Sequence, residues 1–296
     1  MHQIRLLRPI ASRRFLPSST TLVRLLVVGL AIGCADRGPP TDEAPSREPG
    51  LVGARVVRAP ENPRFHADTQ LTLQGRHVNG GCVFERELTL KLGEHVVERV
   101  AEYDLETCLY VVERGDYDFP PSGAHRHRDT STTTKVLLGA PRPSSSVGEN
   151  DSLTMFSPPD VWSHCARSNL WFEDPIGIDV TRSELHVIWE GDGLQVWSAT
   201  AALASRVYEA SGWYVNYHNL ESHYVNPEQT GVEHNGYSIM ENYSFPCPEP
   251  ASTWTNYTPN TMTTHGNGYV TFYSSAYAAG GCSNWLTLYS EYWTDY

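Results

Sequence analysis

Residues 185–196 read Leu-His-Val-Ile-Trp-Glu-Gly-Asp-Gly-Leu-Gln-Val, and this stretch decides the fold class. Up to Trp189, apolar side chains occupy every second position, which is typical of a strand with one buried face. Glu190–Gly193 then has the composition of a tight turn, and the alternation resumes at Leu194. The stretch therefore predicts an antiparallel β-hairpin.

Similar runs recur over residues 151–296, which hold all eight tryptophans and thirteen of the sixteen tyrosines. Short alternating runs separated by turn residues are typical of an antiparallel sandwich or barrel. Ala199–Ala210 is the exception: Leu203 and Val207 lie one helical turn apart, and Gly212 would end a short helix. We predict an all-β chain with an antiparallel, β-sandwich-like domain over 151–296.

A smaller β-rich region is predicted over residues 65–120. Leu88, Leu90 and Leu92 alternate with polar residues and so define a strand. A helix through 96–112 is an open alternative, because its valines also fall near helical spacing. Residues 121–150 are rich in Pro, Ser and Thr, which predicts a linker and places the domain boundary there.

The first 33 residues have the build of a signal peptide. They contain five arginines and no acidic residue, and a short apolar run, Leu25–Ile32, follows the last arginine. At 1.5 Å per residue such a run is too short to span a bilayer as a helix. Residues 34–64 are then rich in Pro, Gly, Arg and Glu, and we predict a flexible tether there.

The end of this segment, Leu30-Ala31-Ile32-Gly33-Cys34, resembles the lipobox of bacterial lipoprotein precursors. The resemblance implies cleavage after Gly33, a lipid on the Cys34 thiol, and a chain tethered to the membrane. Ala35 favours the outer membrane or the cell surface in that family. Simple secretion with an unmodified Cys34 is the alternative.

The charge of the chain disfavours nucleic acid as a partner. Removing the five arginines of the signal segment from the 22 basic residues leaves 17 against 34 acidic residues, a net charge of −17. Such a field repels phosphate backbones. The negative charge is compatible with cations and neutral partners. The alternative is that it only keeps the protein soluble.

The cysteines are expected to pair, since an exported chain meets an oxidising compartment. Cys82 and Cys108 bracket two strand-like runs and form the first predicted disulfide. Cys247 and Cys282 flank strands expected to be neighbours and form the second. With Cys34 carrying lipid, Cys165 is left over.

Three further stretches resemble features of uncharacterised secreted bacterial β-proteins. They are Trp171–Val180, Phe245-Pro246-Cys247 and Gly280-Gly281-Cys282. The resemblance implies an exported β-rich domain with a cysteine pair near its end, and it carries no activity.

Two groups of side chains are candidates for metal ions. Residues 218–234 contain His218, Glu221, His223, Glu233 and His234. Imidazoles together with carboxylates bind zinc, although an ordinary polar loop beside a strand can have the same composition. An acidic group at turns, consisting of Glu173, Asp174, Asp179, Glu190 and Asp192, predicts Ca²⁺, with ordinary turn chemistry as the alternative.

No common catalytic motif occurs, so a non-enzymatic protein is the favoured interpretation. The tyrosines exceed what a sheet core needs, and exposed aromatic rows stack on sugar rings. Candidate binding residues are Trp213, Tyr217, Tyr269 and Tyr273. We therefore expect a surface-tethered or secreted binding protein for a polysaccharide or an envelope partner. The alternatives are an extracellular hydrolase, assisted by a metal at the His218–His234 group, and a structural envelope protein without a small ligand.

Overall fold

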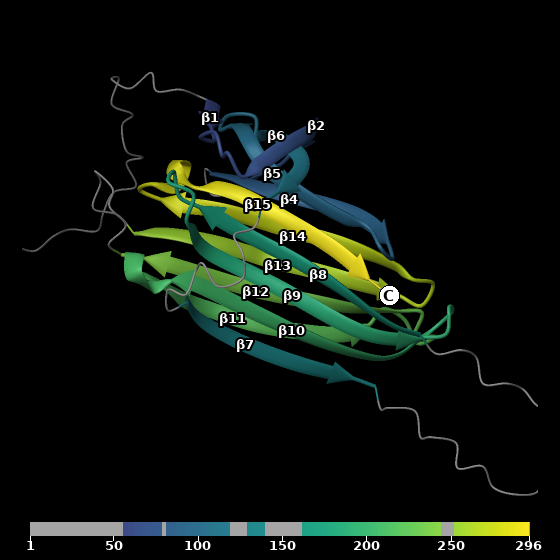
Figure 1. Ribbon diagram of the computed structural model, residues 1–296. Helices are drawn as coiled ribbons and strands as arrows, with labels where there is room; N and C mark the ends of the chain where they lie inside the picture. Colours follow the sequence, from purple (N-terminus) through teal and green to yellow (C-terminus); the bar gives the residue numbers. More distant parts are fainter. Residues whose placement is uncertain (1–55, 79–80, 119–128, 140–161, 244–251, 296) are drawn as a thin grey trace, which may run out of the picture. The chain divides into compact units, whose positions relative to one another are not determined.

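Alternating buried and exposed side chains run along most of the chain, and they form two antiparallel β-sheets (Figure 1). The computed structural model describes residues 56–78, 81–118, 129–139, 162–243 and 252–295. The two sheets pack against each other through strands such as those at 179–191 and 253–265. The prediction of an all-β, sandwich-like fold is confirmed.

The larger sheet has nine strands. They are β1 (Val56–Arg58), β2 (Phe65–Gln74), β5 (His95–Asp104), β6 (Leu109–Tyr117), β7 (Asp129–Leu138), β8 (Trp162–Glu173), β9 (Asp179–Gly191), β10 (Val196–Tyr208) and β15 (Thr287–Asp295). Their order is β2-β6-β5-β15-β8-β9-β10-β7, and β1 pairs with β5 off this path. The C-terminal strand thus lies in the middle of the sheet, between strands from early and late parts of the chain.

The smaller sheet has six strands in the order β11-β12-β13-β14-β4-β3. They are β3 (Arg76–Val78), β4 (Gly81–Lys91), β11 (Trp213–Tyr224), β12 (Gly231–Asn242), β13 (Thr253–His265) and β14 (Tyr269–Gly280). Two short 3-10 helices, η1 (Glu209–Ser211) and η2 (Ser283–Trp285), join β10 to β11 and β14 to β15.

The predicted hairpin is formed by β9 and β10. Asp192 makes the turn, because its carboxylate accepts hydrogen bonds from the backbone N–H groups of Leu194 (3.0 Å) and Gln195 (2.8 Å). Leu185, Val187 and Trp189 are buried between the sheets, as the alternation requires.

The space between the sheets holds hydroxyl groups as well as apolar side chains. Ser205 Oγ lies 2.7 Å from Ser238 Oγ and 2.6 Å from His218 Nδ1, so the larger and smaller sheets share a hydrogen-bond network. Tyr257 OH lies 2.8 Å from Thr181 Oγ1 across the same space. These bonds satisfy polar atoms that burial would otherwise leave without partners.

The two predicted β regions are not separate domains. β4, from the early region, pairs with β14, and β5 pairs with β15, so both sheets contain strands from both regions. The predicted linker contains β7, which pairs along its whole length with β10. The threonine content of this stretch is compatible with a linker, but β-branched threonine also suits an exposed edge strand, which is what β7 forms.

Two helix predictions are wrong. Ala199–Ala210 lies mostly in β10, where Leu203, Ser205 and Val207 all face the interior. A spacing of four residues also keeps a side chain on one face of a strand, so Leu203 and Val207 fit both structures. The alternative helix through 96–112 is likewise replaced by β5 and β6.

Residues 56–64, which were predicted to belong to the tether, are part of the folded body. β1 pairs with β5, and Asn62 and Arg64 donate hydrogen bonds to the buried carboxylate of Glu173 (2.8 and 3.3 Å). Residues 1–55, with the predicted signal peptide, Cys34 and the other residues of the predicted tether, lie outside the described residues.

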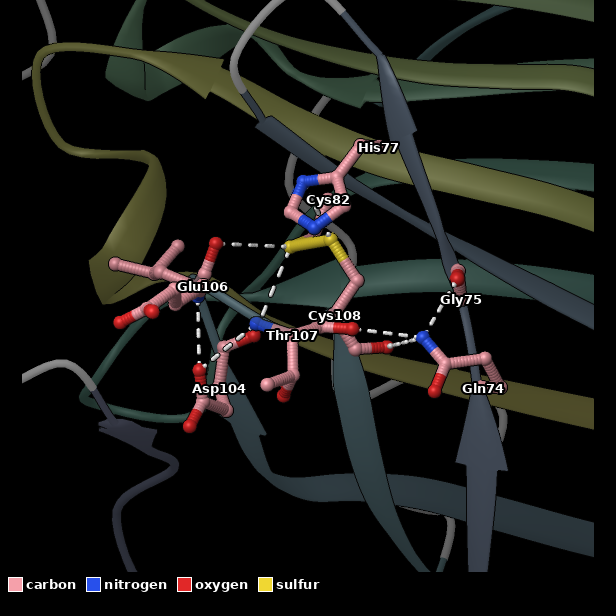
Figure 2. The surroundings of a disulfide bond; sticks show 9 residues. Gln74, Gly75, His77, Cys82, Asp104, Glu106, Thr107 and Cys108 are labelled. Carbon is pink, nitrogen blue, oxygen red and sulfur yellow. Dashed lines mark hydrogen bonds between the residues drawn. A yellow bond between two sulfur atoms is a disulfide. The ribbon is translucent and has the colours of Figure 1, made fainter.

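Cys82 and Cys108 form the predicted disulfide, with Cα atoms 5.2 Å apart. Figure 2 shows this bond with His77 close to it and the turn of Asp104–Thr107 beside it. Cys282 is also disulfide-bonded, and Cys247, its expected partner, lies outside the described residues. Cys165 is a free thiol, and burial raises its pKa.

Candidate functional site

The outer face of the smaller sheet carries a group of aromatic side chains that we name the tyrosine face. Its members come from β11, the end of β12, β13 and β14: Tyr214, Tyr217, Tyr243, Trp254 and Tyr277. Three are strongly exposed, with 48% of Tyr217, 71% of Tyr243 and 38% of Trp254 accessible to solvent. The face therefore offers ring surface to a partner.

Strand register places these rings in two neighbouring rows. Tyr217 on β11 lies opposite Ile239 on β12, and Asn256 on β13 lies opposite both Ile239 and Tyr277 on β14. These residues form a row across four strands with a tyrosine at each end. Adjacent strands lie about 4.8 Å apart, and the row is therefore roughly 14 Å long.

The second row is two residues farther along β12 and β13, and three residues farther along β11, where the register shifts between Val215 and Tyr217. It runs from Tyr214 through Glu241 to Trp254, and the ring of Tyr243 stacks on Tyr214 with centroids 5.4 Å apart. Two residues along a strand are about 7 Å, so both rows fit beneath one extended ligand.

Polar groups between the rings are fixed by hydrogen bonds. Glu241 Oε2 accepts bonds from Tyr214 OH (2.8 Å) and Asn216 Nδ2 (3.2 Å), while Asn256 Nδ2 donates to Tyr277 OH (3.2 Å). Desolvation, Tyr243 and Glu241 together raise the pKa of Tyr214, so its phenol stays neutral. Amides, a carboxylate and phenols alternating with ring faces can hydrogen-bond hydroxyl groups of a stacked ligand.

Three of the four predicted binding residues share this outer face. Tyr217 belongs to the tyrosine face, and Tyr269 and Tyr273 lie farther along β14. Tyr273 OH donates to Glu85 Oε1 (3.2 Å), and Lys91 lies over the Tyr269 ring at 5.9 Å. These two rings therefore form a separate, more charged end of the face.

Trp213 was predicted wrongly as a binding residue. Only 2% of it is exposed, because it faces the interior between the sheets, while its neighbour Tyr214 points outward. A shift of one residue along a strand exchanges the two faces.

Tyr214, Tyr243, Trp254 and Tyr277 were not identified from the sequence. Trp254 stands between Thr253 and Thr255, and alternation alone suggests that the tryptophan is the buried member. The structure has the reverse, with both threonines fully buried. No local signal could have shown this, since the threonine hydroxyls find their partners in distant segments: Thr255 Oγ1 donates to Thr181 across the sandwich, and Thr253 Oγ1 accepts the backbone N–H of Cys282.

The predicted zinc ligands are not brought together. His218 and His234 point between the sheets, where their Nδ1 atoms lie near Ser205 Oγ (2.6 Å) and Ser222 Oγ (2.8 Å). Glu221 and His223 are exposed on the opposite face. Glu233 is on that outer face too, paired with His223 at 3.5 Å. The strand alternation thus divides the group between two sides of the sheet.

The predicted calcium group is also dispersed. Glu173 is buried and accepts bonds from Tyr117 OH and Trp171 Nε1. Asp174 Oδ1 accepts backbone N–H bonds from Ile176 and Ile178 (3.1 and 2.9 Å), as ordinary turn carboxylates do. The remaining three acids bond elsewhere: Asp179 to Arg182, Glu190 to Ser198 and Asp192 to its own turn.

Within the described ranges, one group of three possible metal ligands converges: His77, Cys82 and Cys108, with ligand atoms within 4.8 Å of one another. His77 Nδ1 lies 3.2 Å from Cys108 Sγ (Figure 2). Both sulfurs are consumed by the disulfide, however, and the thiolate is the form that binds metal. As it stands, the group is a disulfide with a histidine neighbour.

No protein-family model, curated protein or solved structure matches this chain. The described part of the chain also contains no helix with the length and apolarity needed to cross a membrane.

Buried His234 is expected to make stability depend on pH. Desolvation, with a smaller contribution from His223, lowers its pKa from 6.5 to about 4. A base with a depressed folded pKa contributes stability above pH 6.5, and this is lost as the pH falls toward 4. The loss is about 3 kcal/mol of unfolding free energy.

Urea unfolding of the wild type and His234→Asn at pH 7, 5 and 4 measures this. The variant should lose less stability on acidification than the wild type does. His66→Asn, at an exposed histidine, is the control and should follow the wild type. A wild type and His234→Asn with equal pH dependence would contradict the assignment.

Proposed function

We propose that this protein is exported, tethered to the cell surface, and binds polysaccharide non-enzymatically through the tyrosine face. The observation that carries the proposal is the exposure of Tyr217, Tyr243 and Trp254 on one face of a rigid sheet. Large rings in solvent leave apolar area uncovered, and such patches are typical of interaction surfaces.

Sugar rings suit this face in both shape and chemistry. The faces of pyranose rings present C–H groups, which pack on aromatic planes, while their edges present hydroxyls. Asn256 and the exposed Asn216 lie between the rings of the tyrosine face and are positioned to hydrogen-bond such edges, whereas Glu241 is buried beneath Tyr214 and Asn216. A row of roughly 14 Å is long enough for more than one sugar unit.

The charge of the chain favours a neutral ligand. The face itself holds the carboxylates of Glu221, Glu233 and Glu241, which would repel an anionic polymer. A neutral glycan meets no such repulsion. A protein partner in the cell envelope is the alternative occupant of the same face, and it would be favoured if the wild type bound none of the glycans tested below.

Support for export comes from the sequence and from the disulfide. The basic, acid-free leader with its lipobox-like Cys34 is the build of a lipoprotein precursor. The Cys82–Cys108 bond is compatible with an oxidising compartment. The hydrolase alternative loses its zinc ligands, since His218 and His223 point to opposite sides of a sheet.

Tyr217→Ala and Trp254→Ala are each expected to weaken glycan binding about 5- to 30-fold, or 1–2 kcal/mol, because each removes a stacking ring. Affinity is measured by calorimetry on the mature chain with soluble β-1,4-glucan, β-1,3-glucan and chitin oligomers. Trp162→Ala is the matched control, since this tryptophan is 56% exposed but belongs to the other sheet.

Binding of one glycan that falls in both variants and persists in Trp162→Ala supports the proposal. Failure of the wild type to bind any of the glycans would overturn it. Equal affinity in all variants would assign glycan binding to another surface.

A further inference from the structure

A cavity of about 320 Å³ opens at the end of the sandwich that holds the Cys82–Cys108 disulfide. Both sheets contribute to its walls, through β4 and β14 on one side and β5, β6 and β15 on the other. The cavity is about twice the size of an engineered 150 Å³ cavity that encloses benzene. It also falls within the usual range for small-molecule sites.

Small side chains create this space. Ala276, Ala278, Ala279 and Gly280 line the cavity at the end of β14, interrupted by Tyr277, whereas the other half of the strand carries Phe272. Large side chains in place of the alanines would fill the interior, as they do in the rest of the core. The opening therefore depends on four small residues within a stretch of five.

The opposite wall is aromatic and its rings are held in place. Tyr103 and Tyr110 stack with centroids 5.4 Å apart, and Tyr110 meets Phe84 edge to face at 5.5 Å. Burial raises the pKa of both tyrosines, so their phenols remain neutral. Fixed rings give a ligand a preformed wall to pack against.

None of the described residues that line the cavity carries a charge. This is unusual in a chain with 56 charged Lys, Arg, Asp and Glu residues, the 22 basic and 34 acidic ones. Ser283 and Asn284 of η2 contribute polar groups and Asn284 is exposed, while the tyrosines and Thr287 contribute hydroxyl groups from the strands. Leu105 is 45% exposed. An ion would lose its hydration here with no partner in return, so the lining excludes charged ligands.

We propose that this cavity binds a free, uncharged apolar molecule of about two fused rings, or an alkyl chain of similar volume. The ligand packs between the alanine wall and the Tyr103–Tyr110 pair and directs any single polar group toward Asn284. Neither Tyr217 nor Trp254 lines this site, although Tyr277, at the end of the tyrosine face, does.

Two dyes with the same ring system test the charge preference. N-phenyl-1-naphthylamine is neutral, and 1-anilinonaphthalene-8-sulfonate adds one sulfonate to a similar frame. Titration of the mature chain should give saturable, 1:1 fluorescence enhancement with the neutral dye and at least tenfold weaker binding of the sulfonate. Absent saturation, or equal affinity for the two dyes, would overturn the proposal.

Filling the cavity tests its location. Ala278→Val and Ala278→Leu should weaken binding of the neutral dye in order of size, with at least a tenfold loss for leucine and an unchanged or raised Tm. Ala202→Leu adds the same group on the outer face of β10 and should bind as the wild type does, as should Tyr217→Ala. Undiminished binding in folded Ala278→Leu would place the dye elsewhere.

Sedimentation with lipid vesicles distinguishes a free ligand from a membrane lipid. In a Cys34→Ala background, which carries no lipid, the protein mixed with phosphatidylcholine vesicles without dye should stay in the supernatant. Sedimentation with the vesicles that Ala278→Leu abolishes would overturn the free-ligand proposal and assign the cavity to bilayer lipid.

Discussion

Replacing Glu98 with alanine is expected to lower the free energy of unfolding by about 3–5 kcal/mol. Glu98 is 1% exposed and lies on β5, facing the smaller sheet. Arg86, on β4, donates two hydrogen bonds to its carboxylate, both 2.9 Å long, so the pair joins the two sheets. Arg114 adds a third bond of 2.8 Å from β6.

The loss arises because alanine would leave a buried guanidinium without a counter-charge. Burial lowers the pKa of Arg86, and the bonds and charge of Glu98 more than offset this, so the net pKa is raised. Without Glu98 only the cost of burial would remain. Glu98→Leu combined with Arg86→Met should recover most of the stability, since a well-packed apolar pair is often as stable as a buried ion pair.

Urea unfolding at pH 7 measures these differences. Glu102→Ala is the matched control: it breaks a pair with Arg58 of 2.7 Å in the same sheet, where the arginine side chain is 78% exposed. That change should cost less than about 1 kcal/mol. A Glu98→Ala loss no larger than that of the control would show that the buried pair does not hold the sheets together.

Replacing Cys82 and Cys108 together with alanine is expected to lower the unfolding free energy by about 3.5 kcal/mol. The two cysteines are 26 residues apart, and on the chain-entropy model a closed loop of this size restricts the unfolded chain by that amount. In the folded protein the bond ties β4 of the smaller sheet to the turn between β5 and β6 of the larger.

Substitution is preferable to a reductant here, because a reductant would also attack the disulfide of Cys282. Cys165→Ser, which removes the free thiol, is the control and should stay within about 1 kcal/mol of the wild type. If the double variant behaved like the control, the disulfide would be dispensable for stability.

The candidate site was only partly visible in the sequence. The excess of tyrosine indicated an exposed aromatic face, and Tyr217 was placed on it correctly. The choice between Trp213 and its neighbour Tyr214 was not decidable, because both are aromatic and alternation does not say which face is inward. The zinc group failed for a related reason: His218 and His223 are close in sequence but five residues apart, so they point to opposite faces of β11.

By itself the sequence determined the fold class, the β9–β10 hairpin and the Cys82–Cys108 pair. Period-two alternation, turn chemistry and cysteine position are local properties, and each acts over a few residues. Tertiary structure alone decided which strands share a sheet, which face of each strand is buried, and where the cavity opens. Those outcomes depend on contacts between distant segments, such as β15 inserted between β5 and β8. In a chain whose interior also holds serine, threonine and histidine, polarity along one strand does not reveal its partner. The hydrogen bonds that permit burial form with other strands, across the sandwich for Ser205 and Ser238 and within one sheet for Ser222 and His234.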